Sequence, residues 1–153
     1  MVVALLLRLA GEHVAALRLD VLGPIEWRVT RPFGYMAQPG EPAVVLEWLR
    51  MRAPLPDDAT LHAAVLAFVS DSGSLNGIEV RYGEKSFAWR ASASLDHALW
   101  IHRPVRWDGW LLMETHSPVA HAARAHTLRR FWTRDGVHVA TMAQEAVVRR
   151  ERE

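Results

Sequence analysis

Residues 56–73 read Pro-Asp-Asp-Ala-Thr-Leu-His-Ala-Ala-Val-Leu-Ala-Phe-Val-Ser-Asp-Ser-Gly, and this stretch decides the fold. The two aspartates predict a helix start, because an aspartate side chain caps free backbone N–H groups and suits the positive end of the helix dipole. Apolar residues then recur at helical spacing. Several alanines leave the helix narrow and apolar nearly all round, which is typical of a helix that is buried.

On both sides of this helix, the pattern of apolar and polar residues indicates strands. The strands are expected at residues 25–30, 44–52, 86–103, 110–117 and 137–149. Residues 74–85 are expected to form a loop, because they hold Asn76-Gly77 and Gly83. Thr133-Arg134-Asp135-Gly136 predicts a hairpin turn. Strands, one buried helix and a long antiparallel meander together predict an α+β domain with the sheet wrapped around the helix.

Composition excludes several classes of function. The chain has 153 residues, half of them apolar, and a net charge of +1, which gives no reason to expect nucleic acid as a partner. It has no cysteine, so a thiol nucleophile is excluded and a reducing, cytoplasmic location is expected. No apolar run reaches the roughly 20 residues of a membrane span. We expect an N-terminal extension of uncertain structure at 1–23, one domain at 24–150 and a tail at 151–153.

Ser94-Leu95-Asp96-His97 invites interpretation as a catalytic triad, but the spacing argues against it. Side chains alternate between the two faces of a strand, so Ser94 and Asp96 are expected on one face and His97 on the other. A base on the opposite face cannot accept the Ser94 proton, and a triad is defined by geometry rather than by proximity in sequence.

Other polar residues offer weaker signals when each is taken alone. The 8 histidines show no metal-ligand spacing, so no metal site is expected. Asp71 is an acid at the end of a helix, where the dipole disfavours it, which leaves either a solvated carboxylate or a functional one. Gln144 lies in an apolar strand, where a glutamine more often faces solvent, although a buried amide must find a partner.

Taken in order along the chain, five segments resemble the acyl-CoA thioesterase II (TesB-like) family. They are Ala67–Asp71, Ala93–Pro104, Glu114–Ser117, Phe131–Gly136 and Ala143–Glu145. The most specific is the second, Ala-Ser-Leu-Asp-His-Ala-Leu-Trp-Ile-His-Arg-Pro. The resemblance implies a hotdog fold, in which an antiparallel sheet surrounds a central helix. It also implies hydrolysis of acyl-CoA thioesters without a covalent intermediate and without a cofactor, CoA being part of the substrate.

The same resemblance implies the catalytic residues. The family's water-activating trio falls on Asp71, Ser94 and Gln144, with serine where threonine is also found. It further implies that Asp96, His97 and Trp100 hold the strand in place rather than react. TesB-like enzymes carry two hotdog units in one chain, and this sequence matches only the second unit.

A lone unit is therefore expected to need a partner, either a second copy through sheet pairing or a separate first-half hotdog chain. Two alternatives stay open. One is a non-catalytic acyl- or CoA-binding subunit. The other is a hotdog hydratase, which generally relies on a catalytic histidine with an acidic partner, and His97 shows no convincing partner on its own face.

Overall fold

A computed structural model describes residues 18–19, 23–30, 44–82 and 92–149. Its strands are β1 (Arg18–Leu19), β2 (Ile25–Val29), β3 (Val44–Met51), β4 (Ala93–Ser94), β5 (Ala98–Ile101), β6 (Leu111–His121), β7 (Arg124–Thr133) and β8 (His138–Val147). They form one sheet in the order β1-β2-β3-β6-β7-β8-β4, and β5 also pairs with β8. All of these pairs are antiparallel, as the α+β prediction requires.

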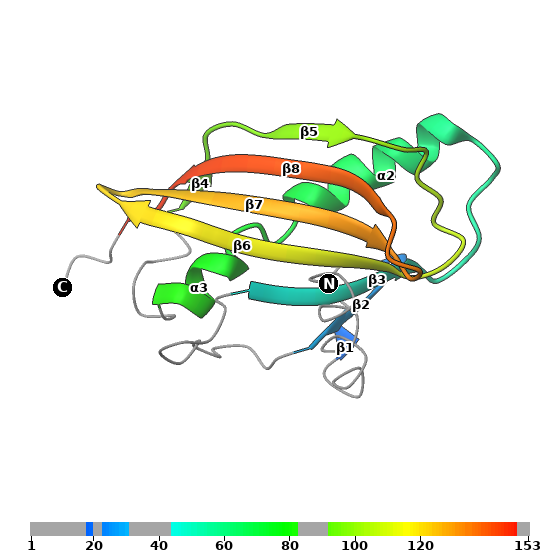
Figure 1. Ribbon diagram of the computed structural model, residues 1–153, viewed down its shortest axis with the longest axis horizontal. Coiled ribbons are helices and arrows are strands. Elements are labelled where there is room, and N and C mark those ends of the chain that lie inside the picture. The colour runs from blue at the N-terminus through cyan, green and yellow to red at the C-terminus, as the bar shows by residue number, and fades with distance from the viewer. Residues whose placement is uncertain (1–17, 20–22, 31–43, 83–91, 150–153) are drawn as a thin grey trace.

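Helix α2 (Ala59–Asp71) lies against one face of this sheet (Figure 1). It begins as the sequence predicts, because the Asp58 carboxylate accepts hydrogen bonds from the backbone N–H groups of Thr60 and Leu61 at 2.8 and 3.3 Å. Leu66 and Val69 are buried in the main core between the helix and the sheet. The helix therefore supplies one wall of the core and ends at Asp71.

Helix α2 is buried on one side only, which corrects the prediction of a helix buried all round. Ala64, Ala67 and Phe68 are exposed, and Phe68 keeps 60% of its surface accessible. The reason is geometric: one sheet covers one face of a helix, and alanines on the other face have little surface to bury.

The prediction of a loop at residues 74–85 is also wrong, because Asn76–Tyr82 form helix α3. Ile78 packs in a small cluster with Ala125 of β7, and this tertiary contact favours helix over turn. A Cβ on Gly77 would lie 3.2 Å from the Ser117 backbone nitrogen and 3.2 Å from Thr115 Cγ2. Gly77 is therefore a close-approach glycine and not a turn glycine.

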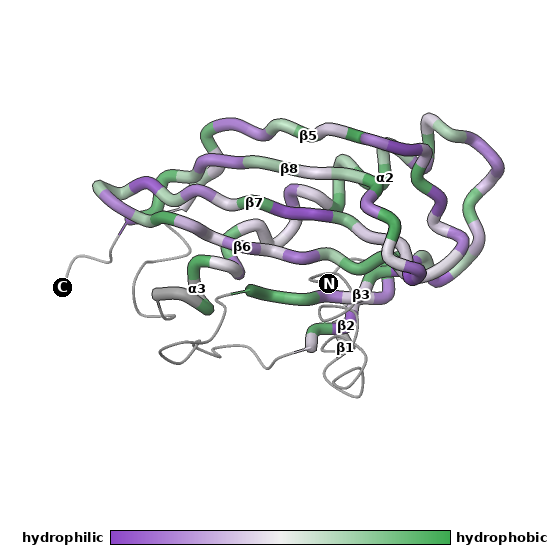
Figure 2. The backbone as a smooth tube through the Cα atoms, in the orientation of Figure 1, coloured by the Kyte–Doolittle hydropathy of each residue, from purple (hydrophilic) through white to green (hydrophobic). Residues whose placement is uncertain are grey.

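The strand expected over 86–103 is two short strands in the described part, β4 and β5, interrupted at residues 95–97. Residues 86–91 of that prediction lie outside the described residues. The other four predicted strands agree with β2, β3, β6 and β8 to within a few residues, and hydrophobic and hydrophilic residues interleave along them (Figure 2). The inward positions of β6, β7 and β8 include Met113, Phe131 and Met142, all fully buried.

Candidate active site

The side-chain amide of Gln144 bonds to both of the other predicted site residues, Asp71 and Ser94. Gln144 Nε2 donates to Asp71 Oδ1 at 2.9 Å and also to Ser94 Oγ. An amide nitrogen carries two hydrogens, so both are used, one for each oxygen. The alternative amide orientation would place an oxygen against the Asp71 carboxylate, which accepts but does not donate when ionised.

The three residues come from three elements that are far apart in the chain. Asp71 is the last residue of α2, Ser94 ends β4, and Gln144 lies in the middle of β8. Strand β4 pairs beside β8 with Ser94 opposite Ala146, which brings the hydroxyl to the inward face next to Gln144. Gln144 is 1% exposed, so the prediction of a solvent-facing glutamine from the residue alone is wrong. Asp71 and Ser94 are exposed, so a buried amide supports two accessible oxygens.

The Ser-Asp-His stretch does not form a triad, because its three side chains bond to three different partners. Ser94 contacts Gln144, Asp96 Oδ1 accepts from the Glu145 backbone N–H at 2.7 Å, and His97 Nε2 lies 2.9 Å from Ser70 Oγ. Asp96 thus ties its segment to β8 beside Gln144, and His97 ties it to α2 beside Asp71. The alternation argument itself does not apply here, because the strand is interrupted at these positions.

A fully buried arginine, missed by the sequence reasoning, lies beneath the site. Arg129 Nη1 donates to the carbonyl oxygens of Ser70 and Ser72 at 2.9 and 2.6 Å, and more weakly to Val69 at 3.4 Å. Its Nε donates to Thr115 Oγ1 at 3.1 Å. A signal was present: Arg129 and Arg130 are consecutive on a strand, so one of them had to point inward.

Glu47 of β3 accompanies this arginine in the interior. Trp27 Nε1 donates to Glu47 Oε1 at 3.0 Å, and Asn76 Nδ2 donates to the same oxygen at 3.4 Å. Burial raises the pKa of Glu47, and the charge of Arg129 opposes that rise. Burial lowers the pKa of Arg129 to about 10, with Glu47 and Asp71 acting in the other direction, so the guanidinium stays charged at neutral pH.

Comparison with known proteins identifies the family to which this chain belongs. The sequence profile of the acyl-CoA thioesterase C-terminal domain matches residues 7–148. The chain belongs to this thioesterase family. A mouse relative, acyl-coenzyme A thioesterase 8, is 38% identical over 128 residues, which are 82% of this chain and 39% of the relative. The chain therefore spans about two fifths of the length of the curated thioesterases it matches. The resemblance to the second unit of TesB-like proteins is confirmed.

Solved structures of similar proteins agree with the fold. The acyl-CoA thioesterase II TesB2 from Mycobacterium marinum superposes with a TM-score of 0.72 at 36% identity, over 84% of this chain and 50% of that chain. A hotdog-fold protein of Alicyclobacillus acidocaldarius gives a TM-score of 0.62 at 16% identity, over 90% of this chain and 52% of that chain. The hotdog prediction is confirmed.

No helix in the described ranges is long and apolar enough to cross a membrane. Across those same ranges, no group of three or more histidine, aspartate or glutamate side chains is arranged to hold a metal ion.

Proposed function

We propose that the chain hydrolyses acyl-CoA thioesters to a free acid and CoA, with Asp71, Ser94 and Gln144 activating the attacking water. The observation that supports this most directly is the Gln144 amide shared between Asp71 Oδ1 and Ser94 Oγ. Two accessible oxygens are thereby held in fixed relation, as water activation requires. The family membership supports the same reaction class.

Each residue has a distinct role in this proposal. Asp71 accepts a proton from the water as general base. Ser94 already accepts from Gln144, and its remaining lone pair accepts the second water hydrogen, so that a water lone pair points at the thioester carbonyl. Gln144 does not touch the water; it fixes the two oxygens that do.

The proposed reaction has two steps and forms no covalent bond between substrate and enzyme. The water oxygen bonds to the carbonyl carbon while its proton passes to Asp71. The tetrahedral intermediate then collapses with cleavage of the carbon–sulfur bond. The departing thiolate resembles that of cysteine, whose pKa is about 8.5, so it leaves without a dedicated acid. Asp71 returns its proton to the thiolate or to solvent.

Replacement of Asp71 by asparagine tests the reaction. Purified protein is given medium- and long-chain acyl-CoA, and the released thiol is measured. Asp71→Asn is expected to lower kcat by about a hundredfold or more, the usual loss when a general base is removed. Asp135→Asn, in the exposed turn between β7 and β8, is the matched control and should leave kcat unchanged. Failure of folded wild-type protein to release thiol, unchanged in Asp71→Asn, contradicts the proposal and favours a non-catalytic acyl- or CoA-binding subunit.

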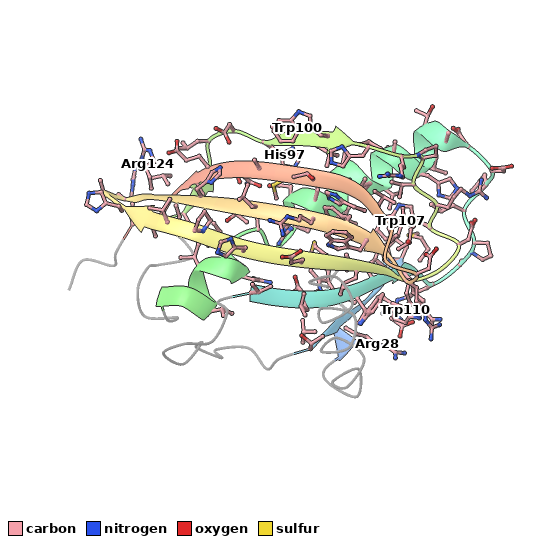
Figure 3. All side chains as sticks on the ribbon, in the orientation of Figure 1. Arg28, His97, Trp100, Trp107, Trp110 and Arg124 are labelled. Carbon is pink, nitrogen blue, oxygen red and sulfur yellow. The ribbon has the colours of Figure 1, made fainter. Side chains whose placement is uncertain are left out.

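We further propose that a second copy of the chain pairs along β5. In the described part of the chain β5 pairs on one side only, with β8, so its other edge is open. Trp100 and Ile101 on this edge are 52% and 44% exposed, and Phe68 of the contacting helix α2 is exposed as well. Figure 3 shows Trp100 at this edge of the molecule. Open edges and exposed apolar patches favour association. The TesB2 chain, twice as long as the segment it shares with this one, has room for two such units.

The mass of the protein in solution tests this pairing. Light scattering is expected to give twice the chain mass. Ile101→Lys should halve it, because the paired edges would then have to bury a lysine from each copy. Val119→Lys, at a similarly exposed position on β6, is the control and should leave the mass unchanged. A wild-type monomer that dimerises only with a separate hotdog chain would contradict self-pairing.

A further inference from the structure

Arg129 donates hydrogen bonds to backbone carbonyl groups on both sides of Asp71. Its Nη1 donates to the carbonyl oxygens of Ser70 and Ser72, the residues immediately before and after Asp71, at 2.9 and 2.6 Å. A second inward side chain of β7 continues this contact, since Thr127 Oγ1 donates to the Ser74 carbonyl at 3.0 Å. The segment that carries Asp71 is thus bonded to β7, the strand that pairs directly with β8 and Gln144.

The chemistry of a helix end explains why a cation lies there. The last carbonyls of a helix have no intrahelical partner and carry partial negative charge. Asp71 adds a full negative charge at the same end, which is unfavourable unless a cation is near. Arg129 attracts Asp71 electrostatically and satisfies the carbonyls at the same time.

Arg129 is itself held in one orientation. Its Nε donates to Thr115 Oγ1 at 3.1 Å, and Glu47 balances its charge from β3. A guanidinium is a planar fork whose donors point in fixed directions, so anchoring Nε also fixes Nη1. A lysine in the same place would keep the charge but offer one mobile ammonium, which cannot serve the helix carbonyls and Thr115 together.

We propose that Arg129 is a positioning residue for the water-activating carboxylate. It acts through the backbone on both sides of Asp71 and sets the distance between that carboxylate and Ser94. This inference rests on the proposed hydrolysis, but it names a residue that touches neither substrate nor water. Sub-ångström positioning of a base matters for rate, since displacement by about 1 Å can cost on the order of a hundredfold.

The test compares Arg129→Lys with Arg130→Lys. Arg130 is the next residue along β7, points to the opposite face and pairs with Glu114 at 3.1 Å near solvent. Arg129→Lys is expected to lower kcat by about tenfold to a hundredfold with KM within about twofold, while Arg130→Lys changes neither. Amide hydrogen exchange gives a second readout. Exchange over residues 68–74 should accelerate in Arg129→Lys only, with the sheet strands unchanged.

Stability is separated from positioning by a double variant. Arg129→Met with Glu47→Gln removes both buried charges together and keeps an amide oxygen for Trp27. This pair avoids an uncompensated buried charge. It provides the same kcat and exchange comparison if Arg129→Lys loses native circular dichroism.

The outcomes separate the two proposals. If wild-type protein turns over and a folded Arg129 variant keeps its kcat, the positioning role is wrong and the hydrolysis stands. If wild-type protein releases no thiol, the hydrolysis fails, and the exchange data alone decide whether Arg129 fixes the helix end. Unchanged exchange over residues 68–74 in a folded variant overturns the inference in either case.

Discussion

Ser70 and His97 are joined by a hydrogen bond of 2.9 Å between Ser70 Oγ and His97 Nε2. Ser70 Oγ also donates its one hydrogen to the Ala67 carbonyl at 2.8 Å, so it accepts from His97, and His97 carries its proton on Nε2. Ser70 precedes Asp71 on the helix, and His97 lies three residues after Ser94. The bond therefore connects the two segments that supply the accessible oxygens of the site.

Loss of this bond is expected to reduce catalysis more than stability. His97→Ala should lower kcat by about tenfold, because the Ser94 segment is no longer tied to the helix end. The melting temperature should change little, since His97 is exposed. Thiol release and thermal unfolding measure the two effects. His121→Ala, at an exposed histidine on β6, is the control, and equal kcat in the two variants would refute the link.

Replacement of Gln144 by leucine is expected to separate activity from stability. Leucine removes both N–H donors, so Asp71 and Ser94 lose their common support and kcat should fall by about a hundredfold. Stability should hold or rise, because Gln144 Oε1 is buried with no hydrogen-bond partner among the described residues and leucine removes that cost. Met142→Leu, on the same face of β8, is the control and should keep its kcat. Full activity in Gln144→Leu would contradict the role assigned to the amide.

Gly77→Ala is expected to destabilise the fold without touching the site. The added Cβ meets the Ser117 backbone nitrogen and Thr115 Cγ2 at 3.2 Å, and overpacking of this kind costs about 1–3 kcal/mol. Alanine recovers up to about 1 kcal/mol through helix propensity. The net loss of about 0–2 kcal/mol corresponds to a fall of up to about 8 °C in the midpoint of thermal unfolding. Gly109→Ala, with no atom within 4 Å of its added Cβ, should shift the midpoint far less. Equal midpoints would show that α3 moves to make room.

His138 is expected to make the fold less stable in mild acid. Burial is the main cause that lowers the pKa of His138; the bond to the Ala140 carbonyl raises this pKa, and the nearby His102, Arg130 and Arg103 lower it further. The folded state therefore prefers neutral His138. Stability is full above the unfolded pKa of about 6.5 and is lost as pH falls toward the folded pKa.

Thermal unfolding at pH 7.5 and pH 5.5 checks this titration. His138→Gln should reduce the fall in melting temperature between the two conditions, because glutamine does not titrate. His121→Gln, at an exposed histidine, should reproduce the wild-type fall. A His138→Gln variant with the full wild-type fall would assign the acid sensitivity to another group.

The sequence predicted the parts of this structure that depend on local physics. The Asp58 cap, the apolar spacing of α2 and the Thr133–Gly136 turn all act within a few residues, and the structure has each of them. Helix α3 was not predicted, because Asn76-Gly77 is typical of a turn when only its neighbours in sequence are considered. Its helical state depends on packing against β6 and β7, which are distant in sequence.

The sequence by itself determined the helix-and-meander order, the absence of thiol chemistry and, through the resemblance, which three polar residues to examine. Only the tertiary structure decided that Gln144 is buried and serves both Asp71 and Ser94, and that Arg129 points inward beneath them. The physical reason is that alternation along a strand says which residues share a face. It does not say which face meets the helix, and that depends on strand register and on contacts across 50 or more residues.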